Sequence, residues 1–142
     1  MNFQKIRLVA WSGFLSTLVL FVVMGLENMT EMFQMDPVFF MVDLAERSIV
    51  LWLLVYLVLG WLWSAAYLFF FNRFLAFEKI PWLRGAIYGI LVGMITYIGI
   101  SMTGDGMGLG SINTQIIGTL LAYTAFGIVL GTIVGMYEKK KK

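Results

Sequence analysis

The chain has 142 residues, of which 61% are hydrophobic and 13% are charged, with a formal net charge of +2. A soluble domain carries about 45–50% apolar and about 25% charged residues, so this composition and the mean hydropathy of +0.89 indicate a membrane protein. There is no cysteine and no histidine, which excludes disulfides, thiolate or imidazole metal sites and catalysis by either side chain. We expect the lipid bilayer, and not nucleic acid, to be its main partner.

Four apolar segments are each close to the ~20 residues that a transmembrane helix requires. The first follows Lys5 and Arg7, but its apolar run exceeds the about 7–15 residues of a signal-peptide core and no cleavage pattern follows, so we interpret it as a retained anchor. Hydrocarbon offers the backbone no hydrogen-bond partners, which favours helices. The predicted fold is all-α: one membrane domain over residues 1–142, a bundle of four transmembrane helices at about 7–26, 49–71, 83–102 and 115–136.

The first connecting loop, residues 27–48, is rich in methionine. Its methionines are Met29, Met32, Met35 and Met41. Soft thioether sulfurs can bind copper(I), but the same spacing forms a helical face, and methionine adapts well to protein surfaces. We favour docking of a partner over a copper(I) site, and no cofactor is predicted. Asp36 as N-cap and Pro37 in the first turn predict a short helix over residues 37–47.

The second span carries aromatic side chains on one helical face: Trp52, Tyr56, Trp63 and Tyr67. At 100° per residue they fall within about 60° of one another. Trp52 and Tyr67 suit the two membrane interfaces, as in aromatic belts. We interpret this aromatic stripe as facing lipid or another subunit, with a flat hydrophobic ligand such as a quinone as the alternative.

The loop after the second span begins with Asn72 to Phe77, NRFLAF. This asparagine-arginine and phenylalanine spacing resembles that which follows the second helix of small four-helix GtrA-type polyprenyl-lipid flippases. The resemblance covers six residues, has no second copy after the fourth span, and would imply a lipid-linked substrate. An interfacial anchor followed by a turn at Pro81 explains the stretch equally well.

The third and fourth spans each contain glycines at four-residue spacing. These are Gly85, Gly89 and Gly93 in the third span, and Gly127, Gly131 and Gly135 in the fourth. Residues four apart share a helix face, so each glycine row forms a groove in which another helix backbone can approach closely. We expect the two spans to pack against each other, although the spacing fits contact between copies as well.

Charge is distributed unevenly between the two sides of the predicted bundle. One side carries nine basic and two acidic residues: Lys5, Arg7, Arg73, Glu78, Lys79, Arg84, Glu138 and Lys139, Lys140, Lys141 and Lys142. The other carries one basic and six acidic residues: Glu27, Glu31, Asp36, Asp43, Glu46, Arg47 and Asp105. Excess lysine and arginine mark the cytoplasmic side. We therefore expect both termini in the cytoplasm and the protein in a bacterial inner membrane. We interpret the terminal lysines as a stop-transfer anchor that also attracts anionic headgroups. The alternative is a dilysine retrieval signal, which would apply only in a eukaryotic endomembrane.

No ionisable residue lies in the interior of a span, which disfavours proton-coupled transport. No nucleophile and base can be paired, so we expect a non-enzymatic protein. The function that we favour is an accessory or scaffold subunit that packs against other membrane subunits or against itself. The alternative is a small oligomeric transporter or channel, for a lipid-linked substrate or for copper(I) through the methionine-rich loop.

Overall fold

The computed structural model describes residues 3–29, 48–74, 79–102 and 112–139, and nearly all of these are helical. Helix α1 spans Phe3–Met29 and α3 spans Ile49–Ala66. The π-helical turn η2 (Tyr67–Phe71) and the short α4 (Asn72–Phe74) continue α3. Helices α5 (Pro81–Met102) and α6 (Ile112–Lys139) complete the chain. The helix predicted over residues 37–47 lies outside the described residues.

Four of these helical stretches are long and apolar enough to cross a membrane, which confirms the all-α prediction at that level. They are Gln4–Glu27, Leu53–Phe74, Pro81–Ile98 and Ile116–Lys139. Helix α5 begins two residues before the predicted boundary because proline fits the first turn of a helix, where its missing N–H costs no hydrogen bond. Ser48 caps α3, since its hydroxyl accepts from the Leu51 N–H at 3.5 Å.

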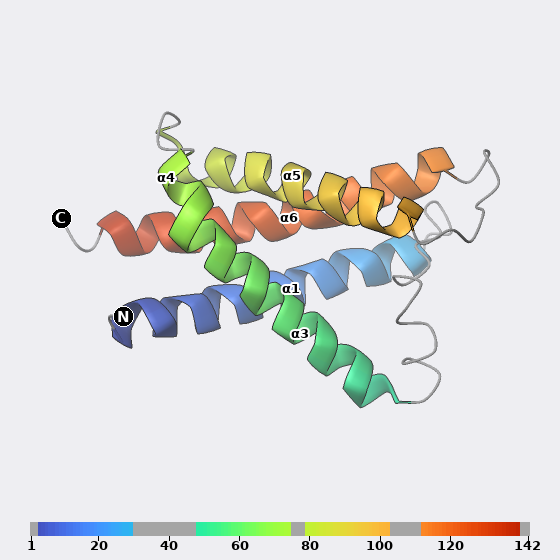
Figure 1. Cartoon of the computed structure of the whole chain (residues 1–142), viewed down its shortest axis with the longest axis horizontal. Coiled ribbons are helices and arrows are strands. Elements are labelled where there is room, and N and C mark those ends of the chain that lie inside the picture. Colours follow the sequence, from blue (N-terminus) through green and yellow to red (C-terminus); the bar gives the residue numbers. More distant parts are fainter. Residues whose placement is uncertain (1–2, 30–47, 75–78, 103–111, 140–142) are drawn as a thin grey trace.

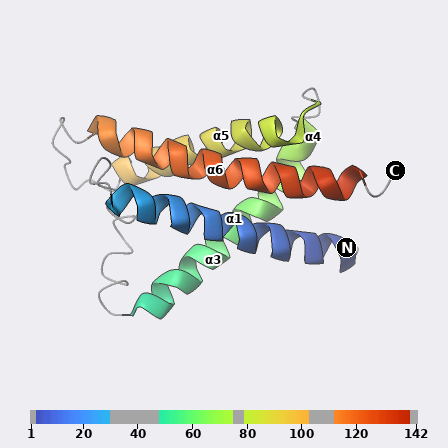
Figure 2. The same cartoon turned by 180° about the vertical axis from the view of Figure 1, so that it is seen from behind.

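The helices form a bundle in which α5 and α6 lie side by side and α1 lies along α6 (Figures 1 and 2). Helix α3 crosses α1 obliquely, and its C-terminal end approaches the beginning of α5 (Figure 1). The start of α1, the short α4, the start of α5 and the end of α6 therefore gather toward one end of the bundle.

Small and hydroxyl-bearing residues form the crossing of α1 and α3. A Cβ atom added at Gly60 would collide with Thr17 Oγ1. The Ser12 and Ser64 hydroxyls hydrogen-bond across the interface at 2.7 Å, and both side chains are fully buried. Close backbone approach and interhelical hydrogen bonds are the usual means by which helices associate in membranes.

Tyr88 joins α5 to the C-terminal part of α3. Its side chain is 0% exposed, and its hydroxyl donates to the Trp63 carbonyl at 2.6 Å. The ring centroid lies 5.0 Å from those of Tyr67 and Phe71. This aromatic cluster fixes η2 and α4 against α5, which positions the polar groups described next.

Candidate functional site: a basic pocket at one end of the bundle

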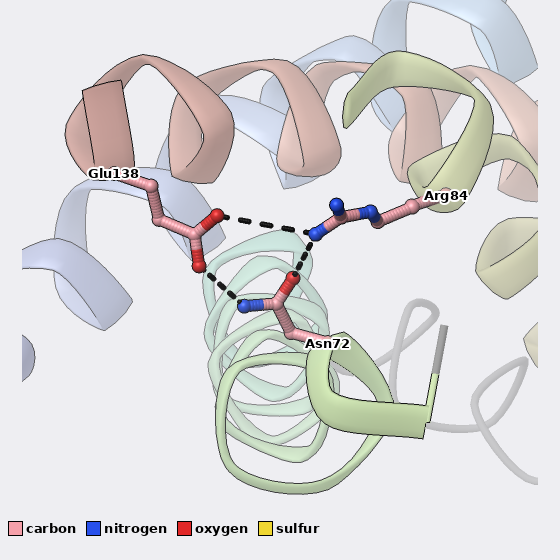
Figure 3. A network of polar contacts seen from close by, with 3 residues as sticks. All are labelled: Asn72, Arg84 and Glu138. Atoms are coloured by element: carbon pink, nitrogen blue, oxygen red, sulfur yellow. Dashed lines mark hydrogen bonds and ion pairs between the residues drawn. The ribbon is translucent and has the colours of Figure 1, made fainter. Parts of the chain in front are cut away.

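Three polar side chains from three helices meet at the end of the bundle where α1 begins and α6 ends (Figures 1 and 3). Asn72 Nδ2 donates to Glu138 Oε1 at 2.7 Å, and Arg84 Nη1 donates to Asn72 Oδ1 at 3.3 Å. Arg84 Nη1 also lies 3.9 Å from Glu138 Oε2. The Arg84 side chain is only 17% exposed, whereas that of Glu138 is 47% exposed. The asparagine therefore bridges a mostly buried cation and a half-exposed anion.

Local sequence explains how these groups converge. Pro81 starts α5 and places Arg84 in its first turn, where the Arg84 N–H donates to the Ile80 carbonyl at 3.1 Å. The π turn η2 uses i→i+5 hydrogen bonds, so it changes the helical face on which the following Asn72 lies. Such wide turns often occur at functional sites. Glu138 lies in the last turn of α6.

A pocket of about 720 Å³ surrounds this network. Its polar lining consists of Lys5, Asn72, Lys79, Arg84, Tyr137, Glu138 and Lys139. Its apolar lining consists of Leu8, Leu68, Pro81, Val134 and Gly135. A neighbouring cavity of about 630 Å³ shares part of this lining and adds Phe69 and Arg73. The size falls within the range of about 300–1,000 Å³ that is typical of ligand sites.

The lining of these two cavities is strongly basic. Among the described residues, this lining contains the carboxylate of Glu138 and five cationic side chains, which are Lys5, Arg73, Lys79, Arg84 and Lys139. The Arg84–Glu138 separation of 3.9 Å is longer than the about 2.7–2.9 Å of a charge-assisted hydrogen bond. Among the described lining residues, positive charge therefore exceeds negative charge, which suits an anionic ligand.

Comparison with known proteins adds one finding. A family described as "Family of unknown function (DUF6789)" matches residues 3–142. The chain belongs to the DUF6789 family. No curated protein and no solved structure matches it. The matched residues include the four long helices and the described pocket-lining residues.

The glycine rows of this DUF6789 chain lie between α5 and α6. A Cβ at Gly85 would lie 2.8 Å from the Gly127 carbonyl carbon, and one at Gly131 would lie 2.8 Å from Gly85 Cα. A Cβ at Gly89 would lie 2.9 Å from Thr124 Cα. The outer members are less confined by backbone: Gly93 faces side chains of Leu120 and Tyr123, and Gly135 faces the ring of Pro81. The two rows thus face each other within one chain.

The aromatic stripe does not form a single lipid-facing surface. Tyr56 is 3% exposed and its ring centroid lies 5.5 Å from that of Phe21, while Tyr67 is 1% exposed. Trp63 is half-buried, and the Trp52 side chain lies outside the described residues. This placement differs from the expected lipid or subunit contact, because the oblique α3 turns the two tyrosines toward α1 and α5.

The methionine cluster is only partly described. Met29 ends α1 and is 83% exposed. Met32, Met35 and Met41 lie outside the described residues. Copper(I) binding and partner docking at this loop therefore both stay predictions.

Sequence reasoning did not single out the network of Asn72, Arg84 and Glu138. It counted Arg84 and Glu138 only as charges on one side and treated Asn72 as part of a loop motif. The topology of the chain could have suggested that the three residues lie near one another. Each lies near a helix end, and the alternating direction of the four predicted spans places those ends on the same side. Asn72 is 12 residues from Arg84 and 66 from Glu138, so no local pattern links them.

Proposed function

We propose that the protein is a non-catalytic accessory or scaffold subunit of a larger complex in the bacterial inner membrane. The observation that carries this proposal is the exposure of the second membrane-length helical stretch, Leu53–Phe74. Only 22% of the apolar stretch in Leu53–Phe74 is buried inside the bundle, compared with 33% to 44% for the other three membrane-length helices. Among the described membrane-length helical stretches, this one is therefore covered least by the rest of the chain, which leaves room for a neighbour.

The exposed surface of α3 includes a row of aliphatic side chains at four-residue spacing. We call it the α3 ridge: Val50, Leu54, Val58 and Leu62, which are 65%, 52%, 53% and 58% exposed. Rows at this spacing pack into grooves of another helix. The glycine rows already face each other inside the chain, so the α3 ridge is the surface that we assign to another membrane subunit.

The distribution of charge supports an orientation with both termini in the cytoplasm. Lys5, Arg84 and Lys139 gather at one end of the bundle, whereas Glu27 lies near the other end of α1. Under the positive-inside rule the basic end faces the cytoplasm.

Two single-cysteine variants test this orientation, because the chain has no cysteine of its own. Met29→Cys and Phe74→Cys replace side chains of similar exposure, 83% and 79%, at opposite ends of the bundle. We expect a membrane-impermeant maleimide to label Met29→Cys in spheroplasts and Phe74→Cys only after permeabilisation. The reverse pattern would place the termini outside.

Purification in mild detergent tests the proposed role. We expect a fixed set of unrelated membrane subunits to accompany the protein at constant stoichiometry. Recovery of a homo-oligomer alone, with a continuous polar path between copies or with stoichiometric copper, would contradict it.

The second candidate is a small oligomeric transporter or channel for a lipid-linked substrate. The pocket of about 720 Å³ favours it, because charged and apolar residues lie together in its lining. Uptake of a fluorescent lipid-linked substrate into proteoliposomes that contain this chain alone would support this candidate.

A further inference from the structure

The pocket lies at one end of the four membrane-length helices. It is formed by the start of α1, the π turn and α4, the start of α5 and the end of α6. Arg84 is three residues into α5, about 5 Å from its first residue at 1.5 Å per residue. With these helices across a membrane, the Arg84 guanidinium lies near the boundary between hydrocarbon and headgroups.

The polar lining fits a phosphate group. The guanidinium of Arg84 is planar and suited to phosphate oxygens, and lysine ammonium groups add mobile positive charge. Asn72 holds Arg84 through its side-chain oxygen at 3.3 Å, which limits the rotamers of a long side chain before a ligand arrives. Lys5, Lys79 and Lys139 are exposed and come from three different parts of the chain.

The apolar lining indicates which source of phosphate fits. Leu8 and Leu68 line the pocket together with Pro81 and Val134. A free phosphate ion gains no binding free energy from these apolar side chains. The glycerol and upper acyl carbons of a lipid can bury apolar surface against them. Basic pockets between transmembrane helices are known to hold anionic headgroups.

We infer that this pocket binds the phosphate of an anionic phospholipid, with Arg84 as the central contact and Glu138 as a competing carboxylate. Binding displaces Glu138 from the neighbourhood of Arg84 or adds a second anion beside it. The inference does not rest on the proposed role as a subunit. It requires only that the helices cross a membrane, in either orientation.

Native mass spectrometry of the delipidated, full-length protein tests the inference. Short-chain phosphatidylglycerol and phosphatidylcholine are titrated separately, and inorganic phosphate is added as a competitor. We expect one phosphatidylglycerol per chain, about 10-fold weaker binding of the zwitterionic lipid, and no displacement by equimolar phosphate. Displacement by equimolar phosphate would assign the pocket to a free anion and overturn the lipid assignment.

Two variants distinguish lipid binding in the pocket from attraction of the lipid to surface charge in general. Arg84→Gln should weaken phosphatidylglycerol binding about 10-fold, because it keeps hydrogen-bond donors but removes the charge. Arg7→Gln is the matched control, since Arg7 is an exposed basic residue of α1 that lines neither of the two cavities; it should change binding by less than about 2-fold. Equal losses in both variants would overturn the site.

Glu138→Gln moves the affinity in the opposite direction. Its amide oxygen can still accept from Asn72, while the negative charge beside Arg84 is removed. We expect phosphatidylglycerol to bind about 3-fold or more tightly. This variant keeps the inference testable even if Arg84→Gln fails to fold, and unchanged or weaker binding would contradict it.

Discussion

Gly127→Val is expected to destabilise the bundle by about 3 kcal/mol or more, the largest effect of any single change considered. A Cβ at Gly127 would lie 2.8 Å from both the N and the Cα atoms of Gly89. These are backbone atoms of a continuous helix and cannot rotate away, so α5 and α6 must separate where they are closest. Reversible unfolding in a detergent-to-dodecyl-sulfate titration, followed by circular dichroism, measures the change in free energy.

Gly25→Val is the matched control for this substitution. It makes the same change of side chain within α1, at a glycine whose added Cβ meets no atom within 4 Å. We expect a change of less than about 1 kcal/mol, of the size that helix propensity alone can give. Equal destabilisation by the two variants would show that the glycine rows contribute no close packing between α5 and α6.

Tyr88→Ala is expected to cost about 3 kcal/mol, the second largest effect. The side chain is fully buried between α3, η2 and α5, and its removal deletes ring contacts with Tyr67 and Phe71 and the hydrogen bond to Trp63. The interior of a membrane protein is no more apolar than lipid, so the loss comes mainly from packing and the hydrogen bond. The same unfolding titration measures it.

Two further variants show how much of the loss in unfolding free energy comes from the hydrogen bond of Tyr88 and how much from its buried ring. Tyr88→Phe keeps the ring and should cost about 0.6–1 kcal/mol, the contribution of a hydrogen bond between membrane helices. Ile90→Ala removes a 42% exposed side chain two residues away and should cost less than about 1 kcal/mol. A loss for Tyr88→Ala no greater than that for Ile90→Ala would contradict the role of Tyr88 as the link between α3 and α5.

The long helices were predictable because hydrocarbon imposes a length and an apolar composition on any spanning segment. The four described helical stretches have this length and composition, and their boundaries differ from the predicted ones mainly where proline or a polar residue permits another helical turn. The glycine spacing was equally visible in the sequence, but spacing alone does not say which helix meets the groove. The structure supplies that by placing Gly85 and Gly127 in opposition.

The interior face of α3 was not predictable from composition. Lipid and protein interior are similarly apolar, so hydropathy does not distinguish a tyrosine that faces lipid from one that is buried. Tyr56 is buried against Phe21 of α1, which α3 crosses at the contact of Gly60 with Thr17, and Tyr67 is buried against Tyr88 of α5. That crossing depends on three-dimensional fit between two helices.

The polar network in the pocket depends on the π turn and on the contact between α5 and α6. No sequence motif marks the three residues of the network, Asn72, Arg84 and Glu138, as members of one site. Their convergence depends on η2, which re-aims Asn72, and on the α5–α6 contact, which brings Arg84 beside Glu138. Sequence reasoning could place all three on one side of the membrane, but it could not place them within hydrogen-bonding distance.

Site-specific photocrosslinking from the α3 ridge tests the proposed subunit role most directly. A photoreactive amino acid replaces Leu54, which is 52% exposed and lies five residues into α3. The control is Ile117, which is 48% exposed and lies five residues into α6. In cells we expect a discrete adduct with one other membrane subunit from position 54 and only lipid adducts from position 117. Lipid adducts alone at both positions would contradict the account.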